Sequence, residues 1–336
     1  MRAYVIPAGN ESVEGLRQVE LTDPPAPKGR QVLVRLRAVS LNYRDHAIVV
    51  GKYRTGPVDR DTIPLSDGAG EVVAVGEEVT GLAPGDRVMN CFAQPPLDGS
   101  ARRVEMLGSP RDGVLCELAL FQETGLVRIP DRFSWEEAAC FPCAGVTAWN
   151  ALFGKGEPVR AGQTVLVLGT GGVSLFALQL ARMAGAQVIV TSSSDEKLAA
   201  VLPLGVQHRI NYRRFPEWQE EVLKITGGRG VDCVVEVGGT GTLGRSFQAV
   251  GENGKVMLIG VLTGGEPPNP GILMLKLASL HGIRVGSRAQ FEALVAAYES
   301  NDARPVIGRR FGFDEVLDAY RVQAAGDFIG KIVIAM

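Results

Sequence analysis

Apolar runs of strand length alternate with helix-length segments through the second half of the chain. The runs are TVLVL (164–168), QVIVT (187–191), DCVVEV (232–237) and KVMLIG (255–260). Continuous apolar runs of this length are typical of strands buried on both faces, as in parallel sheets covered by helices. From about residue 162 onward the sequence therefore predicts a doubly wound α/β domain.

The chain up to about residue 125 has a different pattern of apolar and turn residues. Short valine-rich runs at 32–36, 71–75 and 87–90 alternate with turn clusters such as DPPAPKG and GLAPGD. This alternation favours a strand-rich domain with long connections, and we expect no helix in it.

The tail after the last apolar run begins with TGGEPPNPG (263–271), which is too rich in helix breakers to be anything but a loop. Beyond it we expect a sixth strand at 282–286 and a final strand at 331–335. Helices are expected near 290–300 and near 313–324.

Length and charge limit the classes of partner. A chain of 336 residues is long enough for about two domains with cores of their own. Its 35 Lys and Arg against 37 Asp and Glu give a net charge of −2, so the basic surface that nucleic acid or anionic lipid needs is missing. No apolar run approaches the ~18 residues of a membrane span, and the N-terminus does not resemble a signal peptide. We therefore expect a cytoplasmic protein without nucleic-acid or membrane partners and with reduced cysteines.

Glycine is unusually frequent, with 42 residues and no fixed period. Gly169, Gly171 and Gly172 lie between an apolar strand and a segment of about a dozen residues with helical patterning. Glycines at such a turn let the backbone approach a pyrophosphate, whose charge is met by amides at the helix N-terminus. Ser174 occupies the third position of the G-x-G-x-x-G spacing. This βαβ context predicts a dinucleotide-binding loop, although such a turn can also be purely structural.

A second loop, VGGTGTLG, matches the same spacing more literally through Gly239, Gly241 and Gly244. The helix predicted after it is short, at about 243–250, and the loop follows a later strand. We interpret it as a turn at the carboxyl edge of the sheet, near the nicotinamide end of a cofactor. The alternative is a plain tight turn.

The choice between NADH and NADPH is expected about 20 residues past the glycine loop. Ser192, Ser193 and Ser194 lie there instead of an acid, and Lys197 could neutralise a 2′-phosphate. This favours NADPH, with NADH less expected. The alternative is that the serines cap a helix whose first turn holds Asp195 and Glu196.

Other catalytic signatures are incomplete. Gly172-Val173-Ser174 begins like a hydrolase elbow, but Phe176 stands where the second glycine must be. Cys140 and Cys143 have the spacing of a redox or zinc pair, but no second pair follows at a finger-like distance. We interpret them as buried structural thiols near the start of a helix.

Seven ordered blocks together resemble the medium-chain dehydrogenase/reductase superfamily, and most closely its zinc-independent quinone oxidoreductase-like branch. Besides the glycine loop they are LNYRD (41–45), IPLSDGAGEVVAVG (63–76), GLAPGDRV (81–88), EEAACFPCAGVTAWNAL (136–152), LGVQHRINYR (204–213) and GGRGVDCVVEVGG (227–239). The resemblance implies a GroES-like catalytic domain formed by 1–127 and 289–336. It also implies a Rossmann dinucleotide-binding domain at 128–288, with the active site in the cleft.

The resemblance also bears on metals. Zinc-dependent members take catalytic ligands from a Cys, a His and a Cys or Asp, and carry four closely spaced cysteines in a separate lobe. Here Asn42 and Ser66 stand at the first two positions, Cys143 aligns with the third, and the four-cysteine lobe is absent. A catalytic zinc needs about three protein ligands, so we expect no zinc and no other metal.

By the same resemblance, Asn42, Tyr43 and Asp45 belong to the wall of the catalytic site. Tyr43 or Tyr53 is a possible donor to the substrate oxygen, or Tyr53 is simply a loop residue. Arg44 stands where many zinc members carry a proton-relay hydroxyl, so that relay is not carried over. Its alternative role is a salt bridge to Asp45 or Asp67.

The cofactor set implied by the resemblance extends over the predicted nucleotide domain. Thr147 matches a position at the nicotinamide ribose or ring, and Ser192, Lys197 and Tyr212 match the surroundings of the 2′-phosphate. Ser287 and Arg288 match the nicotinamide half, with a structural domain junction as their alternative. The full set is Thr147, Gly169, Thr170, Gly171, Gly172, Val173, Ser192, Lys197, Tyr212, Gly238, Val261, Ser287 and Arg288.

These residues predict an NADPH-dependent, metal-independent oxidoreductase. Without a Lewis acid, an alkoxide is hard to stabilise, whereas hydride addition to a quinone or an α,β-unsaturated carbonyl delocalises the charge. The alternatives are alcohol or aldehyde chemistry on the same scaffold and a non-catalytic NADPH-binding sensor or crystallin-like protein. Family dimers often pair the last sheet strand, here 283–286, so a homodimer is expected.

Overall fold

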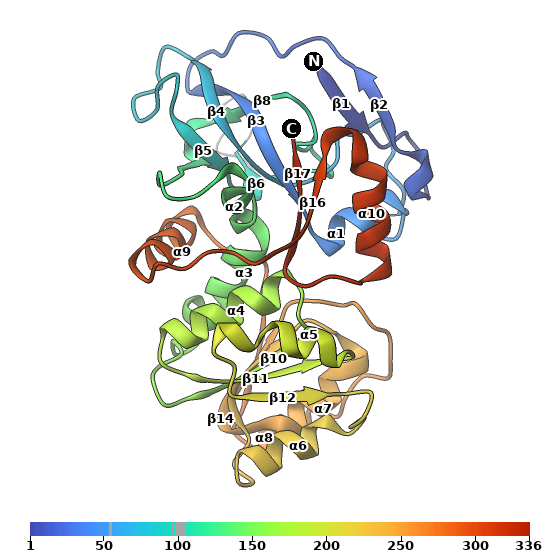
Figure 1. The fold of residues 1–336 in the computed structure, drawn as a ribbon, viewed down its shortest axis with the longest axis vertical. Coiled ribbons are helices and arrows are strands. Elements are labelled where there is room, and N and C mark those ends of the chain that lie inside the picture. Colours follow the sequence, from blue (N-terminus) through green and yellow to red (C-terminus); the bar gives the residue numbers. More distant parts are fainter. Residues whose placement is uncertain (54–55, 96, 98–104) are drawn as a thin grey trace. The chain divides into compact units, whose positions relative to one another are not determined.

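A computed structural model of the chain describes residues 1–53, 56–95, 97 and 105–336. Two compact units are present: unit 1 comprises Met1–Cys143 with Phe291–Met336, and unit 2 comprises Ala144–Gln290. In Figure 1 both ends of the chain, blue and red, lie in unit 1. Compactness does not assign a role to a unit, so the catalytic domain at 1–127 and 289–336 and the nucleotide domain at 128–288 stay predictions.

Unit 2 is built on a six-stranded parallel sheet, which confirms the predicted α/β class. The strand order is β12-β11-β10-β13-β14-β15. The strands are β10 (Thr164–Leu168), β11 (Gln187–Ser192), β12 (His208–Asn211), β13 (Val231–Glu236), β14 (Val250–Leu258) and β15 (Ser279–Gly282). All five neighbouring pairs are parallel.

Helices cover both faces of this sheet. They are α3 (Val146–Trp149), α4 (Gly172–Met183), α5 (Asp195–Ala200), α6 (Trp218–Ile225), α7 (Thr240–Ala249) and α8 (Gly271–Leu275). Helices α4 and α5 lie on one face and α6 and α7 on the other (Figure 1). Because right-handed crossovers run outward in both directions from the centre, the strand order reverses between β10 and β13. The loops after these two strands therefore lie side by side at one edge.

The sixth strand is displaced from its predicted place at 282–286. β15 covers Ser279–Gly282 and pairs in parallel with the end of β14. Beyond it Val285 has φ of 42°, a left-handed conformation that an extended strand cannot contain. The prediction was wrong because an apolar sequence does not reveal a left-handed backbone.

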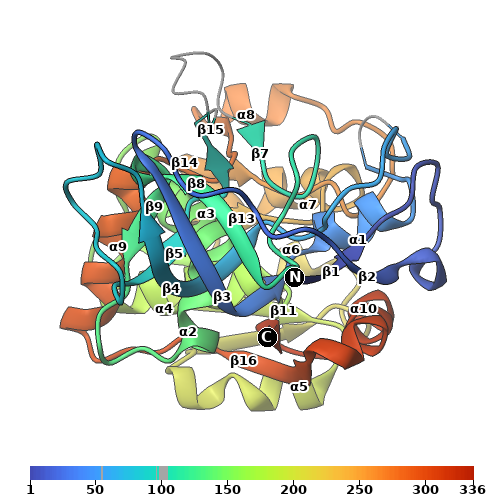
Figure 2. The same ribbon diagram turned by 90° about the horizontal axis from the view of Figure 1, so that it is seen from above.

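Unit 1 contains a seven-stranded sheet in the order β16-β17-β3-β4-β5-β9, with β8 also paired to β3. Strands β3, β4, β5 and β9 lie side by side (Figure 2). The strands of unit 1 are β1 (Arg2–Val5), β2 (Arg17–Glu20), β3 (Gln31–Leu41), β4 (Asp67–Val75), β5 (Arg87–Asn90), β6 (Ala93–Gln94), β7 (Glu105–Met106), β8 (Leu118–Gln122), β9 (Leu126–Arg128), β16 (Ile307–Gly312) and β17 (Lys331–Ala335). The strand-rich character and the final strand at 331–335 were predicted and are confirmed.

A helix within the first 125 residues contradicts the expectation that none would be found there. α1 (Tyr43–Val49) follows β3 directly, and the Asp45 carboxylate accepts a hydrogen bond from the Asn42 backbone N–H at 2.7 Å. This carboxylate at the third helical position satisfies a donor that the helix itself cannot. Seven residues are too few for a visible helical period, but the spacing of Asn42 and Asp45 was a usable signal.

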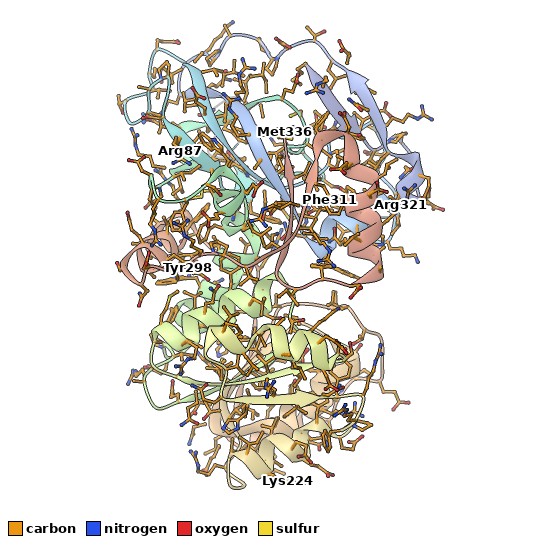
Figure 3. The ribbon with its side chains drawn as sticks, in the orientation of Figure 1. Arg87, Lys224, Tyr298, Phe311, Arg321 and Met336 are labelled. Atoms are coloured by element: carbon orange, nitrogen blue, oxygen red, sulfur yellow. The ribbon has the colours of Figure 1, made fainter. Side chains whose placement is uncertain are left out.

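Three further helices lie wholly or mostly in unit 1. They are α2 (Trp135–Ala139), α9 (Arg288–Ser300) and α10 (Val316–Ala325), and the last two agree with the predicted helices. Tyr298 of α9, labelled in Figure 3, is fully buried, and its ring packs edge-on against Phe141 with centroids 5.1 Å apart. None of the helices formed by the described residues combines the length and apolarity that a bilayer span requires.

Candidate functional site

The structure of unit 1 brings together the three positions that the resemblance relates to zinc ligands. Asn42 lies between β3 and α1, Ser66 precedes β4, and Cys143 lies in the π-helical turn η3 (Phe141–Gly145). Asn42 Nδ2 and Ser66 Oγ are 3.5 Å apart. The Cys143 backbone N–H donates to Asp67 Oδ2 at 3.0 Å, and Ser66 Oγ donates to Asp67 Oδ1 at 2.7 Å. Asp67 thus links Ser66 to Cys143, and Ser66 links this pair to Asn42.

Lys331 is the member of this cluster that sequence reasoning missed. Its side chain enters from the start of β17, and its Nζ donates at 2.7 Å to both Leu41 O and Asn42 Oδ1. The same Nζ lies 3.8 Å from Asp67 Oδ2. Asn42, Ser66, Asp67 and Lys331 therefore form a closed ring of polar contacts, which we call the polar ring.

Burial distinguishes the members of the polar ring. Ser66 and Asp67 are completely buried, and Lys331 is 2% exposed. Asn42 is the one half-exposed member. A molecule that approaches the ring would therefore meet the Asn42 amide first.

The cluster does not fit a zinc ion. Among the described residues, no three His, Cys, Asp or Glu side chains group closely enough to hold a metal. Burial raises the pKa of the Cys140 thiol to about 12 and also raises the pKa of Cys143. Cys140 is buried as predicted and ends helix α2, whereas Cys143 is partly exposed and lies shortly before α3 begins at Val146.

Arg44 is buried beside this cluster and makes one of the salt bridges considered for it. Its guanidinium lies 3.4 Å from Asp45 Oδ1 and donates to Leu107 O at 2.8 Å. The Tyr53 and Phe92 rings lie 5.2 and 4.9 Å from the guanidinium carbon. Arg44 is therefore held by the protein, and it contacts both the Asp45 carboxylate and the Tyr53 ring.

The four predicted catalytic residues are not equally placed. Asn42, Asp45 and Tyr53 are connected, directly or through Arg44, whereas the Tyr43 side chain is 55% exposed. Burial raises the pKa of the Asp45 carboxyl to about 6, with the nearby Arg44 cation acting in the opposite direction. Asp45 is thus a buried acid that titrates in a weakly acidic range.

In unit 2 the first glycine loop has the geometry of an anion cradle. Gly169 has φ of 76°, which favours glycine, and α4 begins at Gly172 directly after the loop. A Cβ added to Gly169 or Gly171 would meet no described atom within 4 Å, so open space lies against this backbone. Ser174 Oγ donates to Leu168 O at 2.7 Å and ties the helix to its strand. The loop therefore fits a dinucleotide pyrophosphate, with Thr170 buried and Val173 half-buried beside it.

The second glycine loop is organised around a buried carboxylate that sequence reasoning missed. Glu236 Oε1 accepts hydrogen bonds from Gly238 N at 2.7 Å, Gly239 N at 3.1 Å and Thr242 Oγ1 at 2.7 Å. The Ser246 hydroxyl donates to Oε2. Because these amides are already engaged, they are not available to an anion.

Close packing explains the glycines of this loop. A Cβ at Gly239 would lie 2.8 Å from Val261 Cα, and one at Gly241 would lie 2.6 Å from Thr263 Oγ1. This geometry supports the plain-turn alternative for the G-x-G-x-x-G match. The loop still lies at the strand-order reversal, and the 81%-exposed Val261 lies against Gly239, the neighbour of Gly238 in the chain.

The predicted 2′-phosphate set gathers at the ends of β11 and β12. Ser192 and Asn211 are partners in the strand pairing, and the Tyr212 N–H donates to Ser192 O at 3.0 Å. Ser194 Oγ accepts from Lys197 N at 3.2 Å, so the helix-cap alternative is confirmed for this serine. The cap and a phosphate contact from the Lys197 side chain do not exclude each other.

The two acids in the first turn of α5 are engaged by protein groups. Asp195 pairs with Arg214 and accepts from Asn211 Nδ2 at 2.8 Å. Glu196 accepts a hydrogen bond from the Ser194 hydroxyl. Arg214, which sequence reasoning did not single out, therefore offsets the negative charge that would oppose a 2′-phosphate here.

The segment that carries Thr147 contacts the segment just before Ser287 and Arg288, within unit 2. Asn150 Nδ2, directly after α3, donates to Val285 O at 2.6 Å, and a Cβ at Gly286 would lie 2.8 Å from Val146 Cγ1. Ser287 Oγ accepts from Gln290 N at 3.2 Å at the start of α9. Ser287 thus has a structural role as a helix cap, in line with the alternative considered for it.

Comparison with known proteins covers both units. Residues 28–131 match the family described as an alcohol dehydrogenase GroES-like domain, and residues 172–300 match the family described as a zinc-binding dehydrogenase. A zinc-type alcohol dehydrogenase-like protein of Schizosaccharomyces pombe is 43% identical over 98% of both chains. A quinone oxidoreductase of Pseudomonas aeruginosa is 33% identical over 93% of both chains, and an acryloyl-coenzyme A reductase of Metallosphaera sedula is 28% identical over 99% of both.

A solved structure is similar to the chain over its full length. The crystal structure of a putative alcohol dehydrogenase from Sinorhizobium meliloti 1021 has a TM-score of 0.87, with 40% sequence identity and complete coverage of both chains. The combination of a GroES-like and a Rossmann-like fold, predicted from the ordered sequence blocks, is confirmed.

Proposed function

The chain belongs to the medium-chain dehydrogenase/reductase superfamily and is an oxidoreductase of it, and we propose that it uses NADPH to reduce a quinone or an α,β-unsaturated carbonyl without a metal. The observation that carries this proposal is the polar ring. At two of the three positions related to zinc ligands, unit 1 places an amide and a hydroxyl, and the Lys331 ammonium contacts that amide. These groups can donate hydrogen bonds, but they are not a zinc-binding set.

The cofactor proposal rests on the first glycine loop and on the groups beyond β11. NADPH, when bound, supplies a hydride, and the open backbone at Gly169 and Gly171 leaves room for its pyrophosphate. Ser192 stands where an NAD site carries an acid. The pairing of Asp195 with Arg214 reduces the repulsion that a 2′-phosphate would meet here, and Lys197 adds a cation that could pair with it. The remaining cofactor contacts predicted from the sequence are part of the proposal.

The substrate proposal follows from the strength of the available donors. A hydrogen-bond donor stabilises a delocalised enolate or a quinol oxygen better than it stabilises a localised alkoxide, because less charge is concentrated on one atom. Asn42, with Tyr53 as a possible second donor, supplies such stabilisation in unit 1. A quinone oxidoreductase and an acryloyl-coenzyme A reductase among the relatives support this substrate class.

The test is NADPH oxidation by the purified protein with a panel of quinones, enones, aldehydes and ketones. We expect turnover with quinones or enones and little with simple ketones. Turnover confined to aldehydes or alcohols would favour the alcohol dehydrogenase alternative, and tight NADPH binding without turnover would favour a sensor or structural protein. Metal analysis is expected to find well below one zinc per chain.

We also propose that the protein is a homodimer through the edge of its parallel sheet. β15 is an end strand of that sheet, and Leu280 on it is partly exposed. Met274, Leu275 and Leu277 on the preceding segment are also exposed, with Leu275 at 81%. An unpaired edge strand beside exposed apolar side chains favours pairing with a second copy.

A further inference from the structure

The atoms around Asn42 fix the orientation of its amide. The Lys331 ammonium can only donate, so the amide atom 2.7 Å from Nζ has to be the oxygen. The amide nitrogen then faces the other way, where Ser66 Oγ lies at 3.5 Å. Ser66 can receive one of the two amide hydrogens, and the second remains for another acceptor.

Charge strengthens this arrangement. Lys331 is buried, so its contact with the amide oxygen is poorly screened by water. A cation at the oxygen draws electrons from the amide nitrogen and makes its N–H groups better donors. Asp67 lies 3.8 Å from Nζ and accepts a hydrogen bond from Ser66, and its negative charge keeps the polar ring near electrical neutrality.

We propose that Lys331 is a positioning residue that holds and polarises the Asn42 amide so that its nitrogen donates to the substrate oxygen. The inference rests on the proposed function and deepens it: the charged group beside the positions related to zinc ligands acts through the Asn42 amide rather than by touching the substrate. Lys331 itself is buried and does not touch the substrate. The alternative is that Lys331 only neutralises Asp67 and closes the start of β17.

Two substitutions of Asn42 distinguish the role of its side-chain N–H donor from the role of its oxygen, which contacts Lys331. Asn42→Ala removes both, and we expect kcat with an enone or quinone to fall about 10²-fold, as for loss of an oxyanion donor. Asn42→Asp retains an oxygen for Lys331 but has no N–H, and we expect a loss at least as large. Wild-type kcat in Asn42→Asp would overturn the proposal, because the donor would then be unnecessary.

Substitutions of Lys331 test whether it acts through Asn42. Lys331→Met should lower kcat about tenfold or more in the wild-type background and less than about threefold in Asn42→Ala, because interacting residues are not additive. Lys331→Arg, which keeps the cation, should recover much of the rate. Equal losses in both backgrounds would overturn the proposal. If Lys331→Met does not fold, the outcome is decided by Lys331→Arg and Asn42→Asp.

A measurement independent of turnover separates this inference from the proposed function. In protein labelled with ¹⁵N, the Asn42 side-chain amide is the pair of NMR signals that Asn42→Ala removes. We expect this pair to shift in Lys331→Met and to stay near its original position in Lys331→Arg. Unchanged signals in Lys331→Met would overturn the inference. Lack of turnover by the wild type would instead refute the proposed function.

Discussion

Glu236 gives a prediction that can be worked through atom by atom. Its carboxylate is completely buried and accepts four hydrogen bonds, from two backbone amides and two hydroxyls. Glu236→Ala would orphan the Gly238 and Gly239 amides and the Ser246 hydroxyl. The Thr242 hydroxyl keeps Gly239 O as an acceptor at 3.2 Å.

The expected cost follows from the number of orphaned donors. Each buried unsatisfied donor costs about 1–3 kcal/mol. Three of them, partly relieved by water entering the vacated space, should lower the free energy of unfolding of unit 2 by about 3–5 kcal/mol.

Glu236→Gln is the matched control. The glutamine oxygen can take the three donors that converge on Oε1, because the opposite orientation would place an NH₂ group against the two backbone N–H groups. That NH₂ group would then face Ser246, whose hydroxyl can also accept. No donor is orphaned, and we expect a loss of only about 1–2 kcal/mol from weakening charge-assisted bonds.

Urea unfolding followed by tryptophan fluorescence measures both variants, since Trp218 lies in the core of unit 2. Two outcomes would refute the reasoning. Equal losses for Gln and Ala would show that counting acceptors does not govern this loop, and a neutral Glu236→Ala would show that the carboxylate does not anchor it. NADPH affinity should be retained in the Gln variant.

Three further predictions concern pH, cofactor choice and assembly. Burial raises the pKa of Asp45 to about 6, above its ordinary value of 3.8, so this group contributes stability at acidic pH that is lost as pH rises through about 6. In urea melts between pH 4 and 7, the free energy of unfolding of Asp45→Asn should depend less on pH than that of the wild type. A difference in free energy between the two proteins that stays constant over this range would contradict the prediction. Lys197→Ala should weaken NADPH about tenfold or more and NADH little in fluorescence titrations, because a charge-assisted bond to phosphate is worth ~1.5–3 kcal/mol; equal losses would exclude the phosphate contact. Leu280→Asp should convert a dimer to a 35.8 kDa monomer in light scattering, whereas a wild-type monomer would refute the edge pairing.

The strands of unit 2 could be predicted because each is an apolar run whose neighbouring residues already indicate a turn or a helix. β10 and β13 are rich in valine and buried on both faces, and short apolar runs between turn residues are typical of strands in a covered parallel sheet. The glycine loop after β10 was likewise visible as a turn between a strand and a helix.

Elements that depend on distant contacts could not be predicted in this way. Lys331 reaches the polar ring because β17 pairs antiparallel with β3, where Ile332 is opposite Leu41. Nothing near Lys331 in the sequence indicates that pairing. Glu236 was missed for a related reason, since a single acid after an apolar run does not reveal that four donors converge on it.

The pairing of β17 with β3 also affects the order in which the chain can fold during synthesis. Unit 2 is continuous, whereas unit 1 needs residues from both sides of it. At the rate of translation, ~5–20 residues per second, β3 is synthesised many seconds before β17, the strand that pairs with its end. Loop closure over this distance also makes folding of unit 1 slow relative to unit 2. A polypeptide released before residue 331 would therefore contain all of unit 2 but no Lys331 beside Asn42, and an open β-edge would be left for chaperones or proteases to recognise.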